Sequence, residues 1–287
     1  MEHATDFLKQ GTEMGTTGIT LDKKKLTGWA RNNRTGQLLF ILAIIVAITV
    51  TEWVFVYQNV AYGIGLALFM AIAVYLVIST GRLNQHITDS AESLVLIPLY
   101  ILFTSSLPWF FINQQYLLPA VYSIIIALCL WHIYHKKLSL RELGFTKKNW
   151  PKYVLLGLAL GIPVGSVEYF ILHPAPAFPT FEIKYLLRDM LYMFGFVGLG
   201  EELLFRALVQ RDLTKAFGFK LSLFLTSVTF AVMHLTWRSM PELAFVFVAS
   251  LLLGYLYHRT KSLVAPIVLH GTNNVILVAV MPYILNW

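Results

Sequence analysis

Residues 200–206 read Gly200-Glu201-Glu202-Leu203-Leu204-Phe205-Arg206, and they place two adjacent acids and an arginine inside an otherwise apolar run, 185–209. Ionisable side chains are costly in the hydrocarbon core of a membrane, so they face a protein interior or a water-filled cavity there. On an α-helix, neighbouring residues point ~100° apart, whereas residues at i and i+4 share a face. The pattern therefore predicts an ion pair between Glu202 and Arg206 and leaves the Glu201 carboxylate free for acid–base chemistry.

The composition around this stretch is that of a membrane protein. Hydrophobic residues make up 57% of the 287 positions and charged residues 13%, and several apolar runs approach 20 residues. These values exclude a soluble domain. The net charge of +7 would favour a nucleic-acid partner in a soluble protein, but here the basic residues lie between apolar runs, so the expected partner is the lipid bilayer and no nucleic acid. The single cysteine, Cys129, excludes a disulfide framework and a thiolate metal site.

We predict an all-α polytopic transmembrane bundle of about nine spans, with eight possible if two of them merge. The expected spans are 37–57, 60–79, 93–112, 116–134, 153–172, 184–212, 220–236, 242–258 and 263–284. The chain is then divided into a basic cytoplasmic tail (1–36), an accessory four-span region (37–135) and a C-terminal region (153–287) that holds the polar motifs. The basic connection 136–152 is expected to form a helix on the inner leaflet.

The distribution of lysine and arginine predicts the orientation. With the N-terminus in the cytoplasm, 18 of the 22 basic residues fall on the inner side, three on the outer side, and Arg206 within a span. Cytoplasmic loops carry such an excess. Nine spans then place the C-terminus outside, and the absence of organelle signals favours a prokaryotic plasma membrane.

Two further spans carry polar residues at helical spacing: Phe230-Ala231-Val232-Met233-His234 and His270-Gly271-Thr272-Asn273-Asn274. At ~1.5 Å per residue from the nearest inner basic residue, Glu201, His234, His270 and Asn274 lie about 15, 21, 14 and 20 Å deep. All four depths fall near the middle of a hydrocarbon core ~30 Å thick. Three spans therefore supply polar groups at one level, as an active site requires.

In this order, EELLFR, FAVMH and HGTNN resemble the three motifs of the CPBP family, the CAAX proteases and bacteriocin-processing enzymes, also called the Abi family. The resemblance covers about 150–284 and implies an intramembrane endopeptidase, acting on a membrane-associated protein or on a peptide precursor such as a bacteriocin or signal peptide, or serving self-immunity. It also implies a role for each motif position: Glu201 activates water, Glu202 and Arg206 are its motif partners, His234 and His270 are the two site histidines, and Asn274 is the polar residue on the oxyanion side.

A metal requirement stays open for such a protein. Glu201, His234 and His270 could form a zinc site with two histidines and one glutamate, but the chain has no HExxH motif and the spacing gives no independent support. No cofactor is therefore predicted firmly, and a divalent metal such as zinc is the alternative.

Several of these residues could also have a purely structural role. Glu202 and Arg206 could only stabilise their helix, Asn274 could join helices, and Asn273 is its rival on the neighbouring face. Glu168 is deep enough to support the site from outside the motifs. For the whole chain, the alternative function is a non-catalytic immunity or regulatory partner that retains the fold. A transporter is a third class, but its expected internal repeat is not visible.

Overall fold

A computed structural model describes residues 33–146 and 148–285, and every regular element in these two ranges is helical. The long helices are α2 (Arg34–Tyr57), α3 (Val60–Ser79), α4 (Gln85–Ser105), α5 (Leu117–His135), α6 (Trp150–Leu172), α10 (Phe219–Val232), α11 (Met240–Thr260) and α12 (Val264–Val275). Shorter helices are α7 (Ile183–Tyr192), α8 (Leu199–Glu202), α9 (Arg211–Phe217) and α13 (Met281–Ile284). The predicted basic tail, 1–36, lies outside the described residues apart from its last four.

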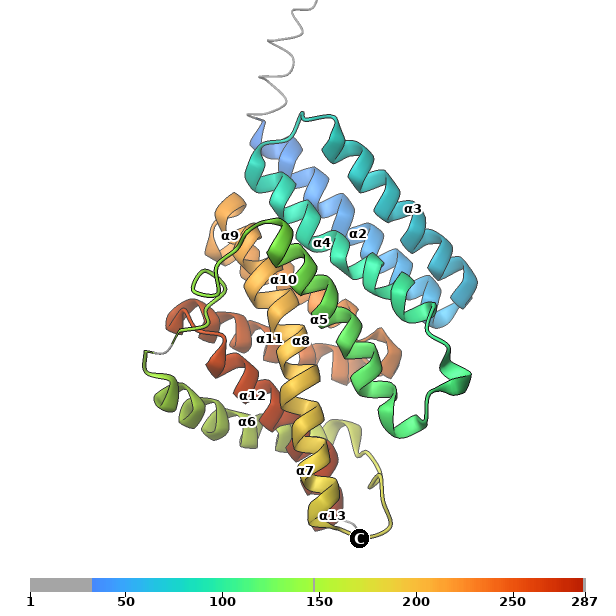
Figure 1. The fold of residues 1–287 in the computed structure, drawn as a ribbon, viewed down its shortest axis with the longest axis vertical. Coiled ribbons are helices and arrows are strands. Elements are labelled where there is room, and N and C mark those ends of the chain that lie inside the picture. Colours follow the sequence, from blue (N-terminus) through green and yellow to red (C-terminus); the bar gives the residue numbers. More distant parts are fainter. Residues whose placement is uncertain (1–32, 147, 286–287) are drawn as a thin grey trace, which may run out of the picture.

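Eight of the helical stretches in the described part of the chain are long and apolar enough to cross a membrane. The predicted polytopic helical bundle is thereby confirmed, and the eight stretches correspond to eight of the nine predicted spans. The predicted span 184–212 is missing from the eight because it is not one uniform α-helix. Helices α7, α8 and α9 follow one another through two π-helical segments, Met193–Gly198 and Leu203–Gln210. Figure 1 shows the result as one long rod through the middle of the molecule.

The other helices pack on both sides of this rod. Helices α2, α3 and α4 form a layer on one side, and α6, α11 and α12 lie on the other (Figure 1). Residues of both sides, from Ile41 to Leu263, belong to one hydrophobic core. The part of the rod that carries Glu201 and Glu202 is therefore buried between the first four spans and the other helices of the C-terminal region.

Helix α6 approaches α12 closely through three glycines at i, i+4 and i+8. A Cβ at Gly157 would lie 2.7 Å from the Val268 side chain, and one at Gly161 would lie 2.7 Å from the Leu269 carbonyl oxygen. Gly165 meets the backbone of Asn273 in the same way. Small residues at this spacing let two membrane helices touch backbone to backbone, so α12, with His270 and Asn274, has a fixed distance from α6.

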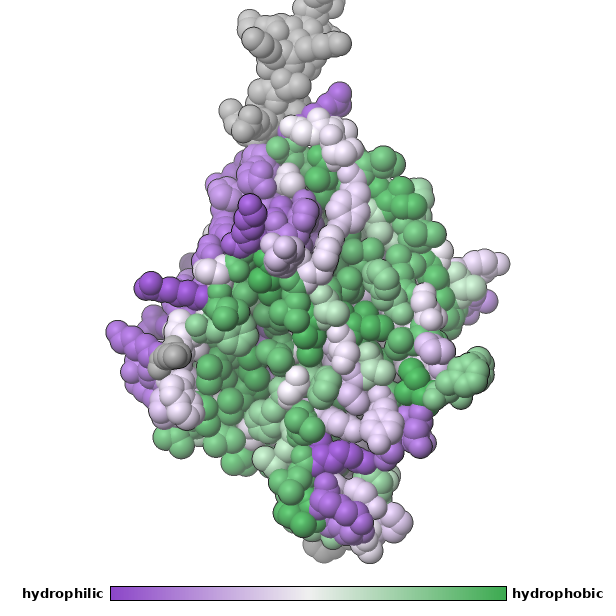
Figure 2. Space-filling model, viewed as in Figure 1, coloured by the Kyte–Doolittle hydropathy of each residue, from purple (hydrophilic) through white to green (hydrophobic). Residues whose placement is uncertain are grey.

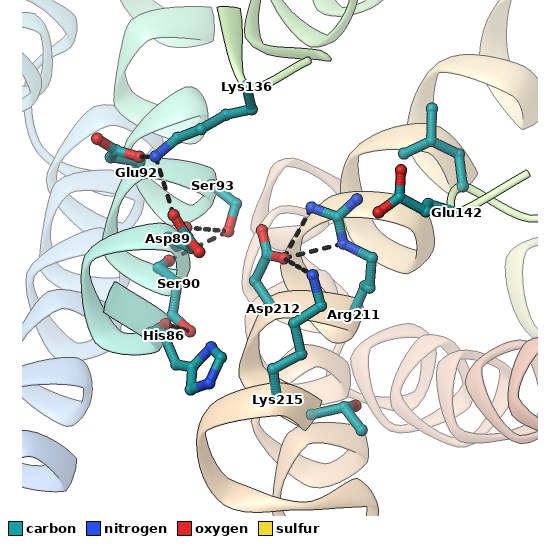
Figure 3. A network of polar contacts seen from close by, with 12 residues as sticks. His86, Asp89, Ser90, Glu92, Ser93, Lys136, Glu142, Arg211, Asp212 and Lys215 are labelled. Carbon is teal, nitrogen blue, oxygen red and sulfur yellow. Dashed lines mark hydrogen bonds and ion pairs between the residues drawn. The ribbon is translucent and has the colours of Figure 1, made fainter. Parts of the chain in front are cut away.

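The third predicted span, 93–112, is wrong by seven or eight residues, because α4 begins at Gln85 and ends at Ser105. The Asn84 side chain caps its start by accepting a hydrogen bond from the Ile87 N–H. The acidic first turns stay helical because Lys136 pairs with both Asp89 and Glu92 (Figure 3).

These pairs belong to a polar network at one end of the bundle. Burial lowers the pKa of the Lys136 ammonium, but its hydrogen bonds to Glu92 and Asp89 outweigh burial and raise the pKa above its ordinary value. On α9, Asp212 accepts from Arg211 at 2.9 Å, and Figure 3 shows this pair beside the acidic turns of α4. The polar side chains of the first four spans and those of α9 therefore face each other across one shared pocket at this end of the molecule.

The predicted inner-leaflet helix in 136–152 is also wrong. Residues 138–146 form turns, and the buried side chain of Leu143 anchors them. The Gly144 carbonyl accepts from the Leu263 N–H at 3.0 Å, so these turns pack on the α11–α12 junction instead of lying free on a leaflet.

The surface agrees with a chain that spans a membrane. Apolar residues cover most of the face drawn in Figure 2, whereas hydrophilic residues gather along the edge near the start of α2 and at the far end near α7. An apolar belt between two polar ends is the surface that a bilayer requires.

Candidate active site

Helix α8 carries Glu201 and Glu202, and the two π-helical segments lie directly before and after it. π-Helical turns occur frequently at functional sites. Both glutamates are buried: Glu202 is fully inaccessible and Glu201 is 8% exposed. They nevertheless have different partners, as the helical spacing predicts.

Glu202 is the centre of a fully paired group. One carboxylate oxygen accepts from Arg206 Nε at 2.9 Å, and the other accepts from His270 Nδ1 at 2.9 Å. Arg206 also donates to the Ser250 hydroxyl on α11 and lies over the Phe230 ring, 4.9 Å from its centroid. Three helical segments are therefore fixed relative to one another by one buried ion pair, which places the His270 ring.

Glu201 is only half satisfied. Its Oε1 accepts from the Tyr122 hydroxyl at 2.6 Å, whereas its buried Oε2 has no hydrogen-bond partner in the described part of the chain. His270 Nε2 lies 3.7 Å from Oε2, which is beyond hydrogen-bond distance. One carboxylate oxygen of Glu201 is therefore held in place and the other is available to a substrate or to water.

His234 lies just after α10, and Phe230 sets the orientation of its ring. The two rings are tilted against each other with centroids 4.8 Å apart. His234 Nδ1 lies 2.9 Å from the Phe230 carbonyl oxygen. A carbonyl can only accept, so Nδ1 carries the hydrogen and Nε2 is the nitrogen left without a backbone partner.

Asn273 and Asn274 have different hydrogen-bond partners, because they lie on different faces of α12. Asn273 donates to Glu168 on α6 and also to the Asn274 side-chain oxygen, the latter at 3.1 Å. The Asn274 amide nitrogen has no partner among the described residues. The carboxyl group of Glu242 on α11 is a close neighbour of Glu168.

A cavity of about 250 Å³ collects most of these side chains. Its polar lining consists of Tyr122, Glu168, Glu201, His234, His270, Asn273 and Asn274. The remaining wall is mainly apolar and comes chiefly from α11, the segment Met193–Gly198 and the segment Ile276–Val280, with single residues from α5, α6, α10 and α12 and Trp237. Glu202 and Arg206 do not line the cavity; they lie behind it and hold His270.

The donors of the alternative zinc set, Glu201, His234 and His270, do not form a metal-binding group among the described residues. Among residues 33–146 and 148–285, no three histidine, cysteine, aspartate or glutamate side chains form a group that could hold a metal ion. Because Glu201, His234 and His270 do not fit a metal as they stand, we derive the chemistry of the site from side chains alone.

Sequence reasoning missed three neighbours of the site. Tyr122 comes from α5, in the first four spans, and Ser250 and Glu242 come from α11. A hydroxyl in an apolar run gives no signal of which distant helix it will contact. Glu242 follows Ser239 by three residues, and this spacing indicates a helix start, which the Ser239 side chain indeed caps.

Comparisons with known proteins identify the family over the part of the chain that builds the site. Residues 184–276 match the family model described as Type II CAAX prenyl endopeptidase Rce1-like, which is the CPBP family. The matched stretch contains all three motifs, so the predicted family is confirmed there, and with it a membrane endopeptidase in general. The same comparisons find no matching curated protein and no matching solved structure.

Proposed function

We propose that this chain, which carries the CPBP motifs within residues 184–276, hydrolyses peptide bonds of membrane-associated proteins or peptide precursors with Glu201 as the general base. The observation that carries this proposal is the state of the Glu201 carboxylate. It is buried, one oxygen is held by Tyr122, and the other lies unpaired beside His270 at a cavity. A positioned carboxylate with one free oxygen is what proton abstraction from water requires.

The first step is attack by water. Glu201 Oε2 takes a proton from a water molecule in the cavity, while the oxygen of that water forms a bond to the scissile carbonyl carbon. The hydrogen bond from Nδ1 to the Phe230 carbonyl sets the orientation of the His234 ring. His234 Nε2 can then accept a hydrogen bond from the second O–H of the same water and align that water for attack. The scissile carbonyl oxygen becomes negatively charged.

The second step returns the proton. The tetrahedral intermediate collapses, the C–N bond breaks, and Glu201 gives its proton to the leaving amine nitrogen. The free amide N–H of Asn274 lines the cavity and is suited to stabilise the charged oxygen until this collapse. The Nδ1–H of His270 is already donated to Glu202, so His270 can donate to that oxygen only as an imidazolium with a second proton on Nε2. Glu202 and Arg206 touch no reacting atom in this scheme; they position His270.

The apolar wall of the cavity favours an apolar segment of the substrate. A transmembrane segment, a lipidated protein end, a signal peptide or a bacteriocin precursor each offers one. A non-catalytic immunity or regulatory partner would need no free base at the cavity, so the unpaired Glu201 oxygen favours the enzyme.

The test is cleavage by the purified protein. Reconstituted in lipid nanodiscs, wild-type protein should cut members of a mixed library of apolar peptides, read by mass spectrometry, and Glu201→Gln protein should cut none of them. Membranes of cells that carry either protein should differ in the same peptides. Equal product patterns for both proteins would refute the hydrolytic role and leave the regulatory alternative.

A further inference from the structure

A second cavity, of about 310 Å³, lies on the other side of Glu201. It shares Tyr122, Glu201, His234 and Trp237 with the first cavity. Its remaining wall comes largely from α2, α4 and α5, so the first four spans build it together with the motif helices. The two cavities meet at Glu201. A substrate segment whose scissile bond lies at Glu201 therefore has space on both sides of that bond.

The far wall of this cavity holds an unpaired acid. Glu52 of α2 is 4% exposed, and its carboxylate has no hydrogen-bond or ion-pair partner within the described ranges. Among the described residues, no lysine or arginine lines the cavity. Arg238, near the end of the same helix, donates to the Val56 carbonyl and lies over the Tyr57 ring instead. An unpaired acid in a membrane span is energetically costly, which makes a partner supplied by a bound molecule the natural explanation.

The other groups around Glu52 are those that accept a cation. Phe55, Tyr100, Trp109 and Trp237 all line the cavity, and aromatic faces attract ammonium and guanidinium groups. Tyr100, Glu52 and Glu201 all line this cavity, so the two carboxylates face one shared space. A carboxylate among aromatic rings is a site for a positive charge with an apolar stem.

We propose that this cavity binds the cationic side chain of a lysine or arginine in the substrate, on one side of the scissile bond. The inference rests on the proposed endopeptidase function and names one feature of its substrate. The stem of such a side chain fits the aromatic wall, and its charged end supplies the partner that Glu52 lacks. The volume lies at the lower end of the ~300–1,000 Å³ of small-ligand pockets, which suits one large side chain.

Cleavage preference tests the proposal. Wild-type protein is given a peptide library with every residue type at each position around an apolar core, and the cleaved sequences are counted. Lysine or arginine should be enriched about tenfold or more at one position relative to the cut, since losing one partner of a desolvated charge pair is costly. Glu52→Gln should remove the enrichment, and Glu52→Lys should replace it with aspartate or glutamate. Glu182→Gln, which changes an exposed acid, should keep the wild-type preference.

Binding without turnover separates this proposal from the endopeptidase function. N-Butylguanidinium should raise the Tm of wild-type and Glu201→Gln protein, and the neutral N-butylurea should not. Without any additive, Glu52→Gln protein should have the same Tm as wild type. With N-butylguanidinium, its Tm should not rise. A Glu52-dependent shift without any cleavage would keep the cation site and refute the protease. Cleavage with no basic preference, or with a uniform rate loss in Glu52→Gln, would keep the protease and overturn the cation site.

Discussion

At the scale of single residues, the two adjacent glutamates differ in their hydrogen bonds: Glu201 has one unpaired carboxylate oxygen, and both oxygens of Glu202 are paired. Glu201→Gln keeps the size of the side chain and can still accept from Tyr122, but it cannot take a proton from water. Turnover should fall ~10²–10⁴-fold, the usual contribution of a general base. The measurement is kcat on a library-derived peptide, with Tm as the control for folding. Wild-type turnover in Glu201→Gln would end the base assignment.

Glu202 should respond differently because it is the counterion of a buried arginine. Glu202→Gln leaves the guanidinium of Arg206 without a charged partner at a fully inaccessible position, and it weakens the bond that holds His270. Breaking one side of a buried ion pair typically costs about 3–5 kcal/mol. The variant should therefore lose stability, measured as Tm in detergent, and part of its activity. The exposed acid Glu182 is the matched control, since Glu182→Gln should change the Tm little.

Asn274 is expected to act on the transition state. Its amide nitrogen has no partner among the described residues and it lines the cavity, whereas the amide nitrogen of Asn273 is already bound to Glu168. Oxyanion donors contribute ~10²–10³ in kcat and hardly affect substrate binding. Asn274→Ala should thus lower kcat with a nearly unchanged KM where chemistry limits the rate. If Asn273→Ala lost more turnover than Asn274→Ala, the donor would be on the other face of α12.

The sequence predicted the different roles of Glu201 and Glu202 better than it predicted which distant side chains contact the site. Helical spacing separates Glu201 from Glu202 and brings Glu202 to Arg206, because those relations lie within one helix. The contacts of Tyr122 and Ser250 depend on how distant helices cross, which no local pattern encodes. The cavity around Glu52 likewise depends on the packing of several helices and has no local pattern in the sequence.

At the scale of helices, the glycine row on α6 sets the position of the active-site helix. At Gly161 a Cβ would lie 2.5 Å from Thr272 Cβ as well as close to the α12 backbone, so Gly161→Val must push the two helices apart. Overpacking of this kind costs about 1–3 kcal/mol. Because α12 carries His270 and Asn274, activity should fall more steeply than the Tm. Gly65→Val on α3 is the matched control, since a Cβ there meets nothing within 4 Å.

Apolar runs predicted where most helices lie, and polar residues caused the errors. The start of α4 was missed because Asp89 and Glu92 look like a loop until their partner Lys136 is known. The π-helical segments around Glu201 were not predictable either, because winding of this kind is imposed by packing against neighbouring helices. The row Gly157, Gly161 and Gly165 was visible in the sequence, but its partner helix was not.

At the scale of the molecule, the proposed division into an accessory region (37–135) and a CPBP-like region (153–287) assigns too little to the first part. Tyr122 holds a candidate catalytic carboxylate, and Glu52 lies in a cavity that reaches it. The ion pairs of Lys136 with Asp89 and of Arg211 with Asp212 line one pocket where the same two parts meet at the other end (Figure 3). We therefore expect the first four spans to take part in substrate selection and not only in anchoring.

The last prediction is the orientation in the membrane. The 18 basic residues assigned to the inner side include those of the 136–152 connection, whereas the 173–182 connection between α6 and α7 has none. Ser139 and Thr180 are both exposed, so accessibility to a reagent depends on the side of the membrane and not on burial. In intact cells carrying a Cys129→Ala background, an impermeant thiol reagent should label Thr180→Cys, and it should label Ser139→Cys only after permeabilisation. The opposite pattern would invert the topology and move the cavity beside Trp109 and Trp237 to the cytoplasmic side.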